Sequence, residues 1–170
     1  MKNSKNKQKI DFLHDNLSKR IVILDGAMGT MIQKLKLSEN DFRGKKFQEH
    51  KVDVMGNNDL LNLTCPELIE EIHYQYLEAG ADIIQTNTFN SNAISQADYN
   101  LEQYSYDLNY EGAKIARKIA DNFSKNDNKK IRFVAGSIGP TNRTASISPK
   151  VDDPGFRNVT FDELVTVYSE

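Results

Sequence analysis

Three short apolar runs, each followed by a polar turn, constrain the fold of this 170-residue chain most strongly. They cover residues 20–24 (RIVIL), 81–86 (ADIIQT) and 131–135 (IRFVA). Continuous runs of this kind, rich in β-branched residues, are typical of strands that are buried on both faces of a parallel sheet. Because helical patterns separate the runs, we predict an α/β fold with parallel strands and right-handed crossovers.

The segments between and after the strands differ in how clearly they predict helices. Apolar spacing predicts helices, in chain order, over about 27–37, 64–79, 92–99 and 104–123, and from 160 onward. Residues 1–19 are expected to be an N-terminal arm with a helical turn near 10–17, residues 38–62 a long excursion without a clear period, and residues 124–130 a solvated turn.

Capping patterns set the expected helix boundaries. Thr64 with Glu67, and Thr160 with Glu163, have the spacing of a capping box, in which a hydroxyl and a carboxylate satisfy each other's backbone N–H groups. Gly80 is placed to end the helix that follows Thr64, since glycine accepts the left-handed conformation found there.

Composition excludes several classes of protein. The 22 Lys and Arg against 24 Asp and Glu give a net charge of −2, so no basic excess points to nucleic acid or an anionic membrane surface. No apolar stretch approaches the ~20 residues that span a bilayer. The polar N-terminus does not resemble a secretory signal, so we expect a cytoplasmic protein. A single cysteine forms no internal disulfide.

Small polar residues follow each predicted strand: Asp25 and Gly26 the first, Asn87 the second and Ser137 the third. Ligand sites in parallel α/β folds lie at these strand ends. The Asp25 carboxylate can hold an ammonium group, and backbone N–H groups around Gly26 and Gly29 can hold a carboxylate, so an amino acid would suit the site. The alternative, that Asp25 only caps the following helix and residues 86–90 form a plain turn, remains open.

Other candidate groups favour structural roles. Glu70 and His73 have the Glu-x-x-His spacing of di-iron bundles, but only one copy occurs, and we favour the surface of an amphipathic helix. We expect Cys65 to be a structural thiol, and His14 and His50 to lie at the surface. No catalytic residue and no metal ligand is identified from these patterns, and they do not determine a reaction.

Four longer runs resemble a known family. Residues 23–31, 56–63, 78–90 and 136–142 closely resemble the N-terminal homocysteine-binding domain of cobalamin-dependent methionine synthases, within the homocysteine S-methyltransferases. The resemblance extends over residues 20–170, which leaves 1–19 as the arm. It implies a (β/α)8 TIM barrel, and since such a barrel needs ~250 residues, this chain is expected to be its N-terminal part.

The resemblance also implies a reaction. A zinc ion held by cysteine thiolates activates the thiol of homocysteine, which takes a methyl group from methylcobalamin; methyltetrahydrofolate then regenerates the cofactor in another domain. By position, Asp25 and Gly26 would hold the amino acid part of homocysteine, with Asn87 and Ser137 at the same mouth. The family's zinc cysteines lie on later strands, and Cys65 matches none of them.

Two classes of function therefore remain open. In the first, the chain is part of a methionine synthase, and a second chain supplies the rest of the barrel and the folate and cobalamin domains. In the second, it is a non-catalytic remnant or binding fragment. It could also be part of a cobalamin-independent homocysteine S-methyltransferase.

Overall fold

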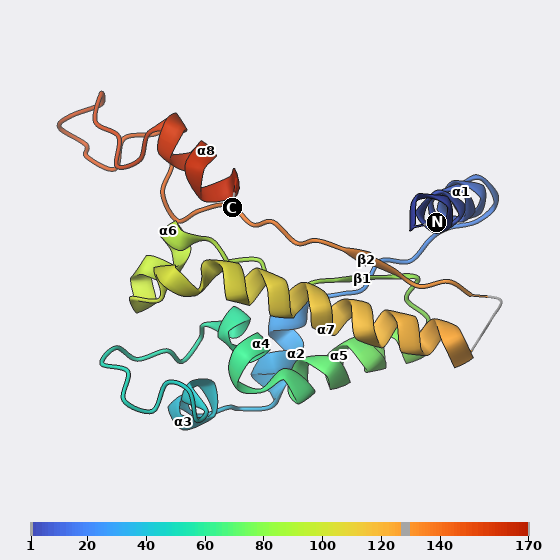
Figure 1. Cartoon of the computed structure of the whole chain (residues 1–170). Coiled ribbons are helices and arrows are strands. Elements are labelled where there is room, and N and C mark those ends of the chain that lie inside the picture. Colours follow the sequence, from blue (N-terminus) through green and yellow to red (C-terminus); the bar gives the residue numbers. More distant parts are fainter. Residues whose placement is uncertain (1, 127–129, 170) are drawn as a thin grey trace.

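A computed structural model describes residues 2–126 and 130–169, and its central feature is a small parallel sheet (Figure 1). Strand β1 (Ile83–Gln85) pairs in parallel with β2 (Phe133–Ala135), with Ile84 opposite Val134. Leu24 adds a parallel bridge to Ile83 on the other side of β1. The predicted α/β class with parallel strands is thus confirmed.

Helices make up most of the remaining chain. In chain order they are α1 (Lys2–Lys19), α2 (Met28–Lys34), α3 (Glu39–Arg43), α4 (Leu61–Thr64), α5 (Pro66–Glu78), α6 (Ala93–Gln96), α7 (Ser105–Asn126) and α8 (Phe161–Ser169), with 3-10 turns η1 (Asn58–Leu60), η2 (Ala97–Tyr99) and η3 (Glu102–Tyr104). The helices predicted near 92–99, over 104–123 and after 160 are confirmed. Of the predicted turn at 124–130, residues 127–129 lie outside the described residues.

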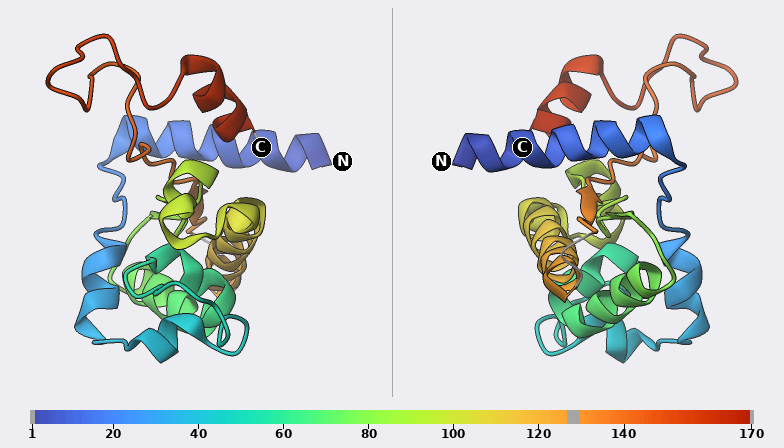
Figure 2. Two further views of the ribbon diagram at one scale, coloured as in Figure 1. Left: turned by 90° about the vertical axis from the view of Figure 1, so that its left-hand side faces the viewer. Right: turned by 90° about the vertical axis from the view of Figure 1, so that its right-hand side faces the viewer.

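The helices α5 and α7 pack together against one side of the strands, whereas α1 and α8 lie on the opposite side (Figures 1 and 2). Ile84 of β1 is fully buried against Leu77, Ala116 and Ala120 of the two helices. A larger apolar cluster joins α2, α3, α4 and α5 to the first half of α7. Burial of this apolar surface supplies most of the driving force for folding.

The first predicted strand is only partly realised. Within residues 20–24 only Leu24 forms a bridge, and Ile21 is 82% exposed, Ile23 49% and Leu24 48%. Burial on both faces was therefore a wrong prediction for this run. The segment is hydrogen-bonded to β1 along one side, and the described residues place no strand along its other side.

One of the two capping boxes is formed. Thr160 accepts from the Glu163 N–H at 3.2 Å, and the Glu163 carboxylate accepts from the Thr160 N–H at 2.7 Å. The predicted box of Thr64 with Glu67 is wrong: α5 begins at Pro66 without a side-chain cap, because Thr64 belongs to α4 and its hydroxyl donates to the Leu60 carbonyl.

Gly80 ends α5 as predicted. Its φ is +109°, and its N–H donates to the Leu77 carbonyl at 3.1 Å. The N–H of Ala81 donates to the Tyr76 carbonyl at 3.0 Å, which completes a Schellman motif and turns the chain into β1.

The N-terminal arm is a helix of 18 residues rather than the single turn that was expected. Phe12 stacks on Phe133 of β2, with 6.5 Å between ring centroids.

The carboxylate of Asp82 binds two arginines. Just after α1, Arg20 donates to both oxygens of Asp82 at 2.7 and 2.8 Å. Arg132 lies 3.5 Å from the same carboxylate. Asp82 therefore joins the three parallel segments at their amino ends, and the Arg20 hydrogen bonds lower its pKa.

Two histidines lie deeper than expected. His73 is fully buried in α5, and neither of its ring nitrogens has a partner among the described residues. Desolvation lowers its pKa to about 4, so it is neutral at pH 7. His50 is half-buried, with its Nε2 atom 2.8 Å from the Tyr99 carbonyl oxygen. The predicted surface positions of His73 and His50 are therefore wrong.

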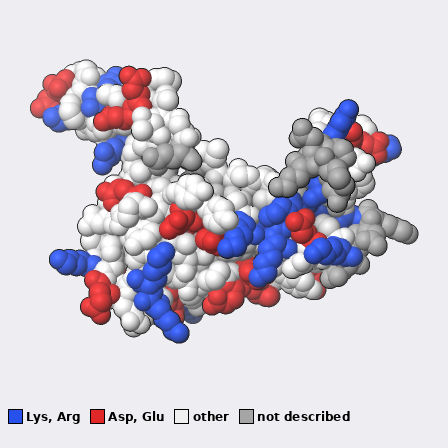
Figure 3. All heavy atoms as spheres, in the orientation of Figure 1, with Lys and Arg blue, Asp and Glu red and all other residues white. Residues whose placement is uncertain are grey.

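Basic and acidic side chains are interspersed on the face drawn in Figure 3 rather than gathered by sign. On α7, for example, Lys114 pairs with Glu111, and Lys118 pairs with Glu70 of α5. Among the described residues, no helix combines the length and the apolar character that crossing a membrane demands.

Candidate functional site

All four predicted site residues line one cavity at the carboxyl ends of the strands, which we call the strand-end cavity. Its volume is about 280 Å³. Its walls come from residues 25–29, 58–59, 85–87, 89–90 and 137. The structure thus brings Asp25, Gly26, Asn87 and Ser137 together, whereas their role toward a ligand stays a prediction.

The Asp25 carboxylate is fixed by the end of β1. Its Oδ2 accepts from the Gln85 N–H at 2.9 Å, and its Oδ1 accepts from Gln85 Nε2 at 3.1 Å. Asp25 therefore does not cap α2, whose N-cap residue is Ala27 without a side-chain bond. Burial raises the pKa of Asp25, and each oxygen retains a lone pair for a further donor.

Gly26 allows a close approach beside Asp25. A Cβ atom at this position would lie 3.2 Å from the hydroxyl oxygen of Tyr76, which itself donates to the Ala27 carbonyl. A larger residue would require Tyr76 or this turn to shift.

Asn87 is held by the segment that precedes α5. Its Nδ2 donates to the Asn58 carbonyl at 2.8 Å and to Asn62 Oδ1 at 3.2 Å. Asn62 in turn donates to the Asn87 carbonyl at 2.7 Å. The amide nitrogen of Asn87 is therefore fully used, and only its Oδ1 is left for a ligand.

Asp59 is a cavity residue that the sequence analysis did not identify. It is 2% exposed, and its Oδ2 accepts from the Asn90 N–H at 2.6 Å and from the Ser91 hydroxyl at 2.8 Å. Burial raises its pKa to about 6. The run 56–63 was noted for its resemblance, but its lack of periodicity gave no indication that Asp59 would be buried at a site.

Neutral donors complete the cavity. The Ser137 hydroxyl and the Asn58 amide nitrogen make no hydrogen bonds within the described residues, so both can donate to a ligand. The lining, as far as the structure describes it, contains Asp25 and Asp59 but no Lys, Arg or His. This arrangement favours a small ligand with a cationic group near the carboxylates and an acceptor near the neutral donors.

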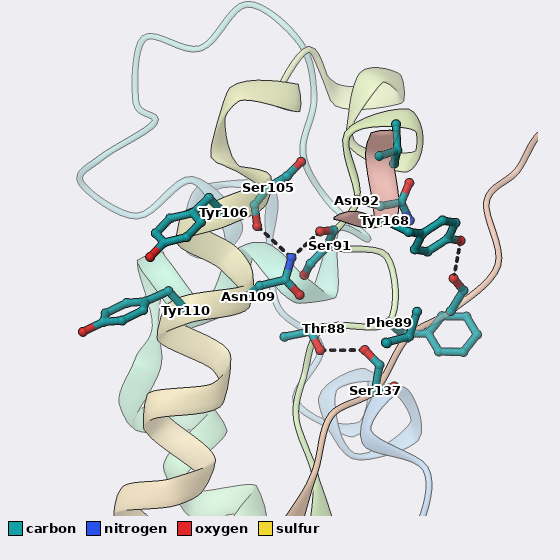
Figure 4. Close-up of a pocket in the computed structure, with 13 residues that line it drawn as sticks. Thr88, Phe89, Ser91, Asn92, Ser105, Tyr106, Asn109, Tyr110, Ser137 and Tyr168 are labelled. Atoms are coloured by element: carbon teal, nitrogen blue, oxygen red, sulfur yellow. Dashed lines mark hydrogen bonds between the residues drawn. The ribbon is translucent and has the colours of Figure 1, made fainter. Parts of the chain in front are cut away.

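A second cavity of about 340 Å³ adjoins the first and shares Phe89 and Ser137 with it (Figure 4). Its lining is uncharged and comes from the loop after β1, the start of α7, residues 137–139 and α8. Asn109 links α7 to that loop by donating to the Ser91 carbonyl at 2.6 Å. Tyr168 of α8 donates to the Gly139 carbonyl at 2.7 Å.

A zinc site of the kind that the resemblance implies does not fit the described residues. No three His, Cys, Asp or Glu side chains in residues 2–126 and 130–169 converge to hold a metal ion. Cys65 lies at the start of α5 outside both cavities, its thiol 3.5 Å from the Asp41 carbonyl oxygen, and burial raises its pKa. Glu70 pairs with Lys118 rather than with His73.

Comparison with known proteins places these features in a family. A family model described as homocysteine S-methyltransferase matches residues 22–170. Two crystal structures of the homocysteine methyltransferase MmuM from Escherichia coli are also similar. The oxidized form matches with 27% identity and a TM-score of 0.59 over 75% of this chain, and the metallated form with 26% and 0.56 over 73%. The chain spans 40% of the length of each.

Proposed function

Because the chain belongs to the homocysteine S-methyltransferase family, we propose that its strand-end cavity binds homocysteine. The observation that carries the proposal is the convergence of Asp25, Gly26, Asn87 and Ser137 on one cavity with two carboxylates and free neutral donors. Homocysteine carries an ammonium group, a carboxylate and a thiol, and the first two match these groups in charge and hydrogen-bonding character.

Each end of the amino acid has a partner in this arrangement. The ammonium group donates to Asp25, whose orientation is set by Gln85. The carboxylate accepts from Ser137 and Asn58. Binding in this way fixes the α-carbon and limits the positions open to the thiol, so the chain contributes orientation of the sulfur.

We further propose that methyl transfer needs a complete (β/α)8 barrel, in which residues 20–24, β1 and β2 would take the first three strand positions. In the reaction, the sulfur forms a bond to the methyl carbon as the bond from that carbon to its donor breaks. Zinc, where it is bound, lowers the pKa of the thiol. Its ligands would come from further strands, on this polypeptide or on a second one, since the described residues offer no such set.

The donor we propose is methylcobalamin, replenished from methyltetrahydrofolate, as in methionine synthases. The support is the resemblance of the four sequence runs, above all residues 56–63. A donor comparison tests this point: the complete barrel should methylate homocysteine with methylcobalamin and not with a sulfonium donor. The reverse preference would favour a cobalamin-independent enzyme.

Calorimetric titration of the 170-residue chain with L-homocysteine under reducing conditions tests the binding proposal. We expect saturable binding, and we expect Asp25→Asn to weaken it by roughly tenfold or more, because a charge-assisted hydrogen bond is lost. Asp15→Asn is the matched control, since Asp15 pairs with Lys19 on exposed α1. The chain alone should show no methyl transfer. Absence of binding, or equal binding by Asp25→Asn, would contradict the proposal.

A further inference from the structure

Asp59 is a buried carboxylate without a cationic partner. No Lys, Arg or His lies within salt-bridge distance of it among the described residues. Its neighbours Leu60 and Leu61 are fully buried, and the residue itself is 2% exposed. A buried charge is costly unless it is paired, so this carboxylate calls for an explanation.

The hydrogen bonds of Asp59 account for only one of its two oxygens. Oδ2 accepts from the Asn90 N–H and the Ser91 hydroxyl, both of which are neutral donors. The described residues make no hydrogen bond to Oδ1. Since Asp59 lines the strand-end cavity, Oδ1 is the acceptor that remains for a ligand there.

The loop that carries these donors is fixed independently of Asp59. Gln96 donates to the Asn90 carbonyl at 3.0 Å, and Asn109 donates to the Ser91 carbonyl (Figure 4). Gln96 and Asn57 also exchange two amide hydrogen bonds, at 2.8 and 3.2 Å. An uncharged amide at position 59 could accept from the same loop, so fixing the loop does not by itself require a carboxylate.

We propose that Asp59 determines specificity for the amino group: its Oδ1 accepts a hydrogen bond from the same ammonium group of the bound amino acid that donates to Asp25. The inference rests on the proposed binding of homocysteine and adds a second anionic partner for the ammonium group. Two carboxylates around one cation exclude thiols that lack the amine, because such ligands would leave both charges unpaired in the cavity.

The test compares two ligands and three proteins by calorimetry: L-homocysteine and 4-sulfanylbutanoate, which lacks the amine, each titrated into wild type, Asp59→Asn and Ser91→Ala. Asp59→Asn removes the charge and keeps an acceptor for the loop. We expect it to weaken homocysteine binding by roughly tenfold or more and to leave 4-sulfanylbutanoate binding unchanged or tighter. Ser91→Ala disturbs the loop bond and keeps the charge, so it should affect both ligands alike.

The outcomes separate this inference from the proposed function. If the wild-type chain does not bind homocysteine, both the proposed function and the role of Asp59 are overturned. Wild type that binds it, together with an Asp59→Asn variant that loses affinity for both ligands equally, overturns only the role of Asp59. If Asp59→Asn fails to fold, the carboxyl carbon signal of Asp59 in wild type is followed by NMR: homocysteine should shift its titration to lower pH and 4-sulfanylbutanoate should not. Equal effects of the two ligands would again overturn the inference.

Discussion

At the amino ends of the strands, the carboxylate of Asp82 lies between two guanidinium groups, whereas at the carboxyl ends the carboxylates of Asp25 and Asp59 lie among amides, hydroxyls and backbone N–H groups. The hydrogen bonds from Arg20 lower the pKa of Asp82, and burial raises that of Asp25 and Asp59. At the amino ends, the buried and paired charge of Asp82 therefore stabilises the fold.

The other end holds charges that the chain does not neutralise. Uncompensated buried carboxylates reduce the stability of the fold, and such groups concentrate at binding and catalytic sites. The same residue type therefore has opposite energetic consequences about one strand length apart. Substitutions at the two ends should separate stability from ligand affinity.

The largest effect should follow Asp82→Asn. This change leaves Arg132, whose side chain is 5% exposed, without a full counter-charge, and we expect the free energy of unfolding to fall by about 3 kcal/mol.

Asp25→Asn is the matched change at the carboxyl ends of the strands. Its amide oxygen can accept from the Gln85 N–H, and its amide nitrogen can donate to the Gln85 side-chain oxygen once that amide is turned over. The change also relieves a desolvated charge, so its cost should stay below about 1 kcal/mol. Urea denaturation measures both, and equal losses would refute the contrast.

Lowering the pH should weaken the fold through His73, which is buried in α5. Its pKa is about 4 when folded and 6.5 in the reference state, so the unfolded chain binds the proton more readily and stability is lost as the pH falls from 6.5 toward 4. At pH 5 the loss is about 2 kcal/mol. Asp59 shifts stability in the opposite direction over an overlapping range, since its folded pKa is raised to about 6.

The variant His73→Leu isolates this contribution, because Asp59 is common to both proteins. The difference in unfolding free energy between His73→Leu and wild type should move in favour of the variant by about 2 kcal/mol between pH 7 and pH 5. His14→Gln, at an exposed position of α1, is the control. A pH-independent difference for His73→Leu would mean that the ring is hydrated or paired.

Residues of the strand-end cavity that directly follow a strand could be predicted from the sequence. A cavity residue whose position depends on contacts distant in the sequence could not. Asp25, Asn87 and Ser137 reach one cavity because parallel strands bring their carboxyl ends together. Asp59 was missed because its burial depends on Asn90 and Ser91, about 30 positions later in the chain, and no local period reveals such a contact.

Burial was the property that the sequence predicted least well. An apolar run such as residues 20–24 reports strand tendency, while the exposure of Ile21 depends on which elements lie beside it. The reverse holds for His73: we expected it on the surface of an amphipathic helix, but α5 packs against α7 and the ring is fully buried.

Gly112→Ala tests how tightly the carboxyl-end network is packed. A Cβ atom there would lie 2.6 Å from Thr88 Cγ2 and 2.7 Å from Asn62 Nδ2, and Asn62 positions Asn87. The helix gains up to ~1 kcal/mol from alanine, but overpacking costs about 1–3 kcal/mol, so we expect a net loss of about 1 kcal/mol and weaker homocysteine binding.

Ala113→Gly, at the adjacent exposed position of α7, measures the backbone contribution alone. If Gly112→Ala stabilises the chain by as much as Ala113→Gly destabilises it, the close approach of α7 to the loop is not a constraint on the site.

The smallest effect should follow Thr160→Val, which removes the oxygen that accepts from the Glu163 N–H and caps α8. A cap contributes about 1 kcal/mol to its own helix. Because α8 has no fully buried residue, we expect the loss to stay local: amide exchange in α8 should rise about fivefold, with global unfolding unchanged. Ser38→Ala is the comparison, since its capping box holds α3, whose Phe42 is buried in the main cluster. It should lower the global free energy of unfolding. An equal global loss for Thr160→Val would show that α8 folds together with the rest of the chain.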